Sequence, residues 1–251
     1  MTGTVQAVRL PHRVASGSAQ MGVDAALLAW AAAGPARLAY RTYGWSRPTL
    51  SLGRREAYPG DWDLDRLREE GVDVVRRPTG GDAVLHDDEV TFAVAASLPG
   101  PWRLTPRGFA DAVADAVAEA AGAVGVEAER VLVADAPAGG GIACFARAAR
   151  GEVRAGAFKI AGLASRFARG AALCHASVPL GTRYREVARY RRDGSRDQDL
   201  IARHARSIGE LAGGTAPGGR AVEEAIAAAL EARIGARLEP ARFADLGIDG
   251  P

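Results

Sequence analysis

The feature that most constrains how this chain folds is a pair of apolar segments separated by two adjacent glycines. Residues 72–97 read VDVVRRPTGGDAVLHDDEVTFAVAAS, and both ends of this stretch are β-branched, apolar runs of strand length. Gly80 and Gly81 let the backbone come close to a ligand because they carry no Cβ. Arg76 and Arg77 supply fixed positive charge beside them. The stretch predicts a ligand-binding loop between two strands or, alternatively, a simple Gly-Gly hairpin with polar ends.

The composition indicates one large domain, or one domain with a small appendage. The 251 residues are 48% hydrophobic, enough for a substantial core, and the formal charge of +2 is too small to indicate nucleic acid by itself. No apolar run is long enough to span a membrane, and the N-terminal residues lack the apolar region of a signal peptide. The two cysteines form no disulfide framework, and no Cys/His cluster has metal-ligand spacing. We therefore expect a cytoplasmic protein with free thiols and no metal site.

Lysine usage in this chain is unusual. Lys159 is the single lysine, and all the other basic residues are arginines. A lysine ammonium is compact and can lose its proton, which an arginine guanidinium cannot do in proteins. The lone lysine is therefore a candidate for lysine chemistry, with chance survival on the surface as the alternative.

Hydrophobic periodicity and turn signals predict a mixture of helices and strands. Helices are expected over residues 20–33, 61–70, 105–122 and 221–238, and strands over residues 38–45, 49–52, 126–133, 152–154, 157–161 and 171–180. Thr105 and Pro106 form a helix start, and Asp61 is the expected N-cap of the second helix. Residues 155–156 are expected to turn a hairpin, and the glycine-rich residues 134–141 to form a loop.

Cys144 follows that glycine-rich loop directly. A cysteine on a loop is exposed enough to react, and Lys159 would lie across the hairpin from it. An ammonium beside a thiol stabilises the thiolate and lowers the thiol pKa from about 8.5. The two residues would then form a nucleophile with a cationic partner. A buried structural cysteine is the alternative, and it is our interpretation of Cys174, which lies in an apolar strand.

Three stretches resemble one known family. RRPTGGDAVLHDDEVTF resembles the RR-x-x-GG-x-AV-x-HD signature of the lipoate ligase and octanoyltransferase family, and WSRPTLSLGRREA resembles its W-x-x-P-x-x-S-x-G-x-x-Q stretch. ACF followed by a lysine strand resembles the cysteine-dependent, LipM-type octanoyltransferases of that family. The resemblance covers roughly residues 21–181. It implies an α+β fold of the biotin/lipoate protein ligase type, with a mixed, largely antiparallel sheet flanked by helices.

The resemblance also assigns roles to individual residues. Cys144 stands where these enzymes form an acyl thioester, and Lys159, in a K-x-x-G-x-A context, stands where a lysine lowers the thiol pKa. The other positions that the resemblance implies for substrate binding lie in the signature or beside the lysine, and they are Arg76, Thr79, Gly80, Gly81, His86, Gly162 and Ala164.

Several departures from the family pattern leave the acyl chain and the acceptor open. GLAS stands for the usual GSAQ after the lysine, HAS stands for HGS on the next strand, and ARAARGE follows ACF where an acidic, serine-bearing stretch is usual. Asp82 replaces a small or basic residue, and Glu56 replaces a glutamine.

The resemblance implies an acyltransferase of protein lipoylation that needs no cofactor. Acyl carrier protein would donate an octanoyl group to Cys144, and a lysine of a lipoyl domain or of glycine-cleavage H protein would accept it. Lys159 would stabilise the thiolate and take protons, while backbone N–H groups near Gly80, Gly81 and Cys144 would stabilise the oxyanion. The alternatives are a lipoate ligase that uses ATP and magnesium, an amidotransferase that takes its acyl group from H protein, and a non-catalytic acyl- or carrier-binding module.

The C-terminal part is less informative. Residues 184–206 interleave arginines with tyrosines, which is typical of a solvated helix face, but docking of nucleic acid or of an acidic carrier protein are alternatives. Residues 213–219 form a Gly/Pro linker. We expect a catalytic domain over residues 1–212, and a linker and helical segment packed on it over residues 213–251. We also expect a monomer that binds neither nucleic acid nor membrane.

Overall fold

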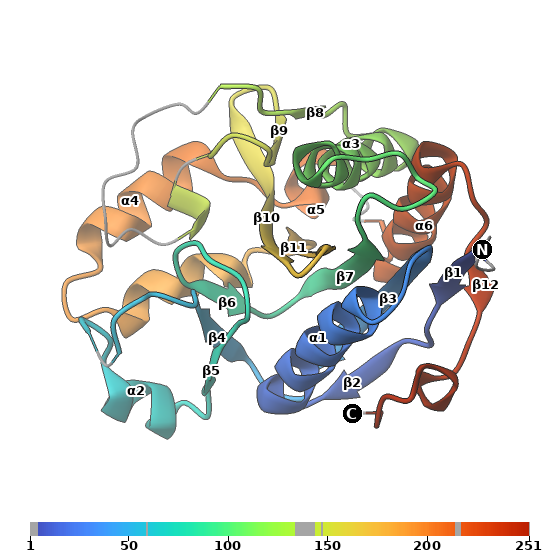
Figure 1. Ribbon diagram of the computed structural model, residues 1–251. Coiled ribbons are helices and arrows are strands. Elements are labelled where there is room, and N and C mark those ends of the chain that lie inside the picture. Colours follow the sequence, from blue (N-terminus) through green and yellow to red (C-terminus); the bar gives the residue numbers. More distant parts are fainter. Residues whose placement is uncertain (1–4, 59, 134–143, 147, 214–216, 251) are drawn as a thin grey trace.

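The computed structural model describes residues 5–58, 60–133, 144–146, 148–213 and 217–250. Figure 1 shows a large sheet in the centre, helices on both of its faces, and a smaller sheet beside it. The glycine-rich loop expected at residues 134–141 lies outside the described residues.

Nine strands of the described chain form the main sheet. In spatial order they are β12 (Glu239–Pro240), β1 (Gln6–Arg9), β3 (Arg37–Trp45), β7 (Glu89–Ser97), β11 (Ala171–Pro179), β10 (Phe158–Ala168), β9 (Val153–Ala155) and β8 (Glu129–Arg130), with β2 (Arg13–Ala15) beside β3. Pairing is antiparallel from β3 to β8, whereas β1 is parallel to β3 and β12, and β2 is parallel to β3. The predicted α+β class with a mixed, largely antiparallel sheet is confirmed.

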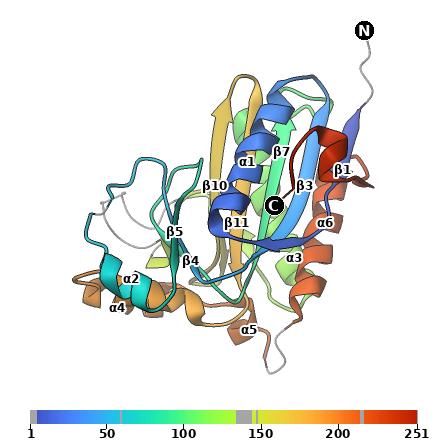
Figure 2. The same cartoon turned by 90° about the horizontal axis from the view of Figure 1, so that it is seen from below.

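The smaller sheet is built from the signature stretch. Its strands are β5 (Asp73–Arg76), β4 (Thr49–Leu52) and β6 (Val84–His86), in that order. It has its own apolar core, shared with α2 (Leu64–Glu69), η2 (Arg183–Tyr190) and α4 (Ser195–His204). In Figure 2 this layer stands to one side of the main sheet. The signature thus joins two sheets, because β7 belongs to the main one.

Helices cover both faces of the main sheet. Side chains alternate between the faces along each strand, so Ala93 of β7 packs toward α1 (Gly17–Ala32) while its neighbour Val94 packs toward the other face. That other face is covered by α3 (Pro106–Ala123) and α6 (Gly219–Ile234), which also pack against each other. Alternation in the central strands therefore fixes which side chains reach α1.

Two helices begin elsewhere than expected because other side chains cap them. α1 begins at Gly17, three positions before the expected start, since the Ser16 side chain accepts a hydrogen bond from the N–H of Ala19. The N-cap of α2 is Asp63, and not Asp61 as expected. The Thr105 cap and the following Pro106 are confirmed at the start of α3.

Three other boundaries also differ. The strand expected over residues 126–133 is only the two residues of β8. Val126 and Val131, on either side of β8, are buried, but neither belongs to a strand. The hairpin between β9 and β10 turns one residue later than expected, at residues 156–157, since Ala155 pairs with Phe158. α6 ends at Ile234 because Gly235 adopts a left-handed φ of 65°.

The C-terminal segment packs on the main sheet. α6 contributes to the core that contains α3, β12 pairs with β1, and η3 (Phe243–Leu246) completes the segment; the short helix α5 (Ile208–Leu211) precedes it. In the arginine-rich region, Arg185 and Arg189 form surface ion pairs with Glu210 and Glu70. No helix among the described residues is long and apolar enough to cross a membrane.

Candidate active site

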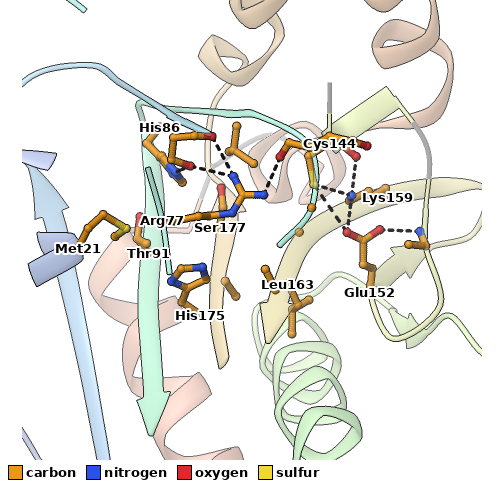
Figure 3. A pocket seen from close by; sticks show the side chains of 18 of the residues that line it. Met21, Arg77, His86, Thr91, Cys144, Glu152, Lys159, Leu163, His175 and Ser177 are labelled. Atoms are coloured by element: carbon orange, nitrogen blue, oxygen red, sulfur yellow. Dashed lines mark hydrogen bonds and ion pairs between the residues drawn. The ribbon is translucent and has the colours of Figure 1, made fainter. Parts of the chain in front are cut away.

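A cavity of about 160 Å³ lies between the two sheets. Its wall is formed by strands of both sheets, by the loop after β5 and by η1 (Cys144–Ala146). Figure 3 shows Met21 of α1 at one end of the cavity, with Cys144, Glu152 and Lys159 together at the other.

Cys144 is held at the wall by the short helix that it begins. Its N–H donates a hydrogen bond to the carbonyl of Ala83 at 3.1 Å. The next residue, Phe145, is buried against Tyr184 with ring centroids 5.0 Å apart. These anchors leave the Cys144 side chain partly exposed and facing the cavity.

Lys159 meets the cysteine directly, as the sequence indicated. Its side chain is 1% exposed, and its Nζ lies 3.3 Å from Cys144 Sγ and 2.6 Å from the Cys144 carbonyl oxygen. The hairpin partner of Lys159 is Arg154, so the cysteine approaches from η1 and not across the hairpin. The register of β9 and β10 shifts between Lys159 and Ala161, and such a bulge re-aims a side chain.

Glu152 completes this group and was missed by the sequence analysis. Its Oε1 accepts a hydrogen bond from Lys159 Nζ at 2.6 Å and lies 3.8 Å from Cys144 Sγ. Its Oε2 accepts from the N–H of Ala149 at 2.6 Å. A signal existed, because the predicted hairpin began with this acidic residue only a few positions before the lone lysine. We call Cys144, Glu152 and Lys159 the Cys144 cluster.

Electrostatics in the Cys144 cluster differ from the expectation. Burial raises the pKa of the Cys144 thiol, Lys159 lowers it and Glu152 raises it, and the net pKa is raised. Burial lowers the pKa of Lys159, but attraction to Cys144 and Glu152 outweighs that, and the net pKa is raised. The lysine is therefore an ammonium at neutral pH and the cysteine a thiol. The sequence predicted a lowered thiol pKa from the Lys159 cation alone, and it did not include the effect of the buried Glu152 carboxylate.

Arg77, rather than the expected Arg76, faces the cavity. Arg77 is 4% exposed, and its guanidinium donates to the carbonyl oxygens of Gly80 and Asp82, each at 2.7 Å. Arg76 is exposed and donates to the carbonyl of Gly53 instead. Since adjacent residues of an extended chain point in opposite directions, only one of the two arginines can face inward.

The two glycines of the loop have different positions. Gly81 lines the cavity with a φ of +93°, and a Cβ there would lie 2.9 Å from the Arg77 guanidinium. A Cβ on Gly53 would lie 1.8 Å from the Gly81 carbonyl oxygen. Gly80 lines an adjacent surface groove. A residue without a Cβ is therefore required at Gly81 and at Gly53. This favours a ligand-binding loop over a simple Gly-Gly hairpin.

His86 lines the cavity within a polar network. Its Nδ1 lies 2.7 Å from Glu89 Oε1 and its Nε2 lies 2.7 Å from Ser51 Oγ, so the network assigns the proton to Nδ1. The ring stacks on Trp45 with centroids 4.2 Å apart. Ser177 donates its hydroxyl proton to the same glutamate. These contacts fix the orientation of the His86 ring.

Thr79 belongs to a second buried group, Asp24, Arg41, Thr79 and His175, which we call the α1 cluster. Arg41 donates to Asp24 Oδ1 at 2.5 Å, and His175 Nδ1 donates to Asp24 Oδ2 at 2.8 Å. The other ring nitrogen of His175 accepts from the Thr79 hydroxyl at 2.6 Å. This chain of contacts ties the glycine loop to α1. Its members are far apart in sequence, so no local pattern could have paired them.

The α1 cluster has its own pKa shifts. Burial raises the pKa of Asp24, but Arg41 and His175 outweigh it, and the net pKa is lowered. Burial lowers the pKa of His175, and Asp24 opposes this only in part. At neutral pH the cluster therefore contains an ionised aspartate, a guanidinium and a neutral imidazole.

Three further expected positions are placed as follows. Gly162 and Ala164 of β10 line the cavity, and a Cβ on Gly162 would lie 3.4 Å from Cys144 Sγ. Cys174 is fully buried in the core against α3 and α6, where burial raises its pKa to about 11. The second cysteine is therefore a core residue. Among the described residues, no group of three or more His, Cys, Asp or Glu side chains could hold a metal ion.

Comparison with known proteins places this geometry in a family context. Residues 16–231 match the family model described as lipoyl protein ligase A/B catalytic domain. Octanoyltransferase LipM of Kyrpidia tusciae is 35% identical over 252 residues, which cover 94% of this chain and 90% of that protein. Octanoyltransferase LipM of Oceanobacillus iheyensis is 34% identical over 162 residues, which cover 64% of this chain and 59% of that protein.

Solved structures agree with the fold. The crystal structure of lipoate-protein ligase A bound with ATP superposes with a TM-score of 0.78 at 18% identity, covering 95% of this chain and 89% of that one. At this identity the similarity shows the fold alone, and it confirms the lipoate ligase type of architecture.

Proposed function

The chain belongs to the lipoyl protein ligase A/B catalytic domain family, and from that premise we propose that it transfers an octanoyl group through a thioester on Cys144. It is an acyltransferase, as its octanoyltransferase relatives are. The proposed donor is octanoyl acyl carrier protein. The proposed acceptor is a lysine of a lipoyl-domain protein or of glycine-cleavage H protein.

One observation carries the proposal: a cysteine thiol and a buried ammonium in contact at the wall of a cavity. Cys144 Sγ and Lys159 Nζ lie 3.3 Å apart, and the bare backbone of Gly81 lines the same cavity. A thioester carbonyl entering here would meet a sulfur nucleophile and a cation that stabilises developing negative charge. A ligase that forms an acyl adenylate would have no need of the cysteine.

The proposal extends to conditions and location. A thioester donor is already activated, so the reaction would proceed without nucleotide or metal. We propose that the protein acts as a cytoplasmic monomer, and that the cavity accepts the narrow acyl chain with Met21 at its far end.

The test combines octanoyl carrier protein, an apo lipoyl domain and the purified chain, with and without ATP and magnesium. We expect octanoylation of the domain lysine in both conditions, and one octanoyl group on Cys144 when the acceptor is omitted. Intact-mass and peptide mass spectrometry measure both products.

Two results would replace the proposal. Octanoylation that requires free octanoate and ATP identifies a ligase. Transfer only from octanoylated H protein, with acyl carrier protein inert, identifies an amidotransferase that shares the thioester but not the donor.

A further inference from the structure

Glu152 lies between the two residues that carry the proposed reaction. Its Oε1 is 2.6 Å from Lys159 Nζ and 3.8 Å from Cys144 Sγ, within reach of the thiol S–H. Its Oε2 is fixed by the N–H of Ala149 at 2.6 Å. The Glu152 side chain is 7% exposed, so these contacts, and not solvent, set its position.

Lys159 is poorly suited to take a proton in this arrangement. Its Nζ is surrounded by the Cys144 carbonyl oxygen at 2.6 Å, Cys144 Sγ at 3.3 Å and Glu152 Oε1 at 2.6 Å. An ammonium offers three N–H donors and has no lone pair with which to accept. The raised pKa of Lys159 agrees with this geometry.

The reaction nevertheless needs a proton acceptor beside the sulfur. Among the described residues, the charged groups that act on Cys144 are Lys159, Glu152 and Arg77. Two of these are cations, and an arginine does not release its proton in proteins. Glu152 is the one carboxylate among them, and carboxylates are common general bases when they lie within reach of the proton.

We propose that Glu152 is the general base and acid of the acyl transfer, shuttling one proton between Cys144, the leaving group and the acceptor amine. This assignment rests on the proposed thioester route. Lys159 then remains an ammonium throughout, where it orients the carboxylate and stabilises the thiolate.

In the loading step the Cys144 sulfur forms a bond to the donor carbonyl carbon while its S–H proton passes to Glu152 Oε1. The carbonyl π pair moves onto oxygen. When the oxyanion collapses, the carbon–sulfur bond of the donor breaks, and the departing thiolate takes the proton back from Glu152. The products are acyl-Cys144, free donor thiol and ionised Glu152.

In the transfer step the neutral acceptor amine attacks the acyl-Cys144 carbonyl carbon. An N–H proton of the amine passes to Glu152 as the carbon–nitrogen bond forms. Collapse breaks the bond between the carbon and Cys144 Sγ, and the cysteine thiolate takes the proton from Glu152. The products are an amide, a neutral thiol and the starting carboxylate.

A purely structural role for Glu152, as a support for Lys159, predicts a different result for acyl transfer. Glu152→Gln retains the shape and can still accept hydrogen bonds, but it removes the negative charge beside the sulfur. Burial then remains as the described influence that raises the thiol pKa against Lys159 and Arg77. If Glu152 is a base, the variant should transfer the acyl group slowly although its thiol ionises more easily. If Glu152 only supports Lys159, glutamine should largely replace it and transfer should be nearly normal.

The experiment measures thiol reactivity and acyl transfer on the same variant. For Glu152→Gln we expect the pH midpoint of Cys144 alkylation by iodoacetamide to move to lower pH. We expect transfer from preloaded acyl-enzyme to the lipoyl domain to fall by at least about a hundredfold, the lower range for a lost acid–base group. Loading should be affected less, because easier ionisation of Cys144 compensates for the missing base in that step, and acyl-enzyme should therefore accumulate. Glu129→Gln, a surface change on β8 of the same sheet, is the matched control.

Wild-type loading separates the two proposals. If wild-type Cys144 takes no octanoyl group, the proposed function fails. If it loads and Glu152→Gln transfers within about threefold of wild type, or if the alkylation midpoint moves upward, only the assignment of Glu152 is overturned. Glu152→Ala supplies a second route: it opens space beside the cavity, and added formate should restore transfer while chloride should not. Absence of formate rescue, with loading intact, also contradicts a base at this position.

Discussion

The Cys144 cluster lines the cavity and the α1 cluster reaches it through His175; the two contain similar groups but differ in what supports them. Each pairs a buried carboxylate with a buried cation, Glu152 with Lys159 and Asp24 with Arg41. The α1 cluster joins a long helix to central strands of the main sheet. The Cys144 cluster is held by the three-residue η1 and by the hairpin of β9 and β10.

The comparison shows that burial of an ion pair does not by itself indicate chemistry. A buried pair is costly to desolvate, and removing one partner leaves an uncompensated charge. In the α1 cluster the contacts of Asp24 with Arg41 and His175 hold α1 against the main sheet, and we expect them to be structural. In the Cys144 cluster the pair also contacts the sulfur of Cys144, a residue that lines the cavity. We therefore expect changes in the Cys144 cluster to alter activity and changes in the α1 cluster to alter the stability of the fold.

The largest effect is expected from Cys144→Ala. The variant should carry no octanoyl group after incubation with octanoyl carrier protein, and transfer should be abolished because the nucleophile is gone. Its free energy of unfolding should change little. Intact-mass spectrometry and urea unfolding measure the two properties.

Cys174→Ala is the control for that variant, because it removes a thiol from the core. We expect it to load normally and to lose roughly 1 kcal/mol of stability from the small cavity. An octanoyl adduct that persists in Cys144→Ala and disappears in Cys174→Ala would reverse the assignment.

The next largest effect is expected from Lys159→Arg. The described residues place three acceptors around a compact ammonium, and the lysine is 1% exposed, so a planar guanidinium has no matching space. We expect kcat/KM for transfer to fall by at least about a hundredfold, the lower range for a lost donor that stabilises developing charge. Arg154→Lys, the hairpin neighbour, should leave activity unchanged. Full activity in Lys159→Arg would show that a positive charge of any shape suffices.

Asp24→Asn tests the other side of the comparison. It leaves the Arg41 charge buried without its carboxylate, so we expect a loss of about 3–5 kcal/mol in the free energy of unfolding. The exposed control Asp65→Asn breaks a surface pair and should cost less than about 1 kcal/mol. Chemical denaturation measures both. Octanoyl loading of Cys144 should persist in folded Asp24→Asn, and its disappearance would mean that the α1 cluster also serves the reaction.

The smallest effect is a pH dependence of stability that originates at His175. Its pKa in the folded state lies below the ordinary value of 6.5, mainly because of burial. Its contribution is therefore complete above pH 6.5 and falls as the pH decreases from there toward the folded pKa, by at most about 1.4 kcal/mol per pH unit. Asp24 adds to the fall only below its ordinary value of 3.8.

The measurement for this effect is urea unfolding of wild type and His175→Gln between pH 5 and 8. We expect the variant to be less stable at pH 8 and to lose less stability on acidification than wild type does. Parallel curves for the two proteins would mean that His175 does not titrate differently in the folded and unfolded states.

Much of the sheet was predictable because its strands have strong local signals. β3, β4 and β11 were expected within a residue or two of their ends, since their apolar runs have strand length and Pro48 separates the first two. α3 was equally clear from its cap and its apolar repeat. β1, β2 and β12 were missed because these short strands are defined mainly by their neighbours in space.

The site was predictable only in part, because many of its contacts also join residues that are far apart in the sequence. Cys144 and Lys159 came from a resemblance and from the rarity of lysine, and the structure brings them together. The contact between His175 and Asp24 joins residues 151 positions apart, which no periodicity reveals. The choice between Arg76 and Arg77 depended on the phase of the strand that leads into the loop, and a one-residue difference in phase reverses which side chain faces inward.

The burial of the lone lysine has a consequence for the protein's own surface. In an enzyme that acylates lysine amines, any exposed lysine of the enzyme near the opening of the cavity would compete with the intended acceptor. This chain contains one lysine, and that residue is 1% exposed and held by three acceptors. Its surface cations are arginines, which do not form stable amides under these conditions. If the proposed acceptor is correct, the enzyme carries no lysine that it can modify by mistake, and self-acylation is avoided by composition.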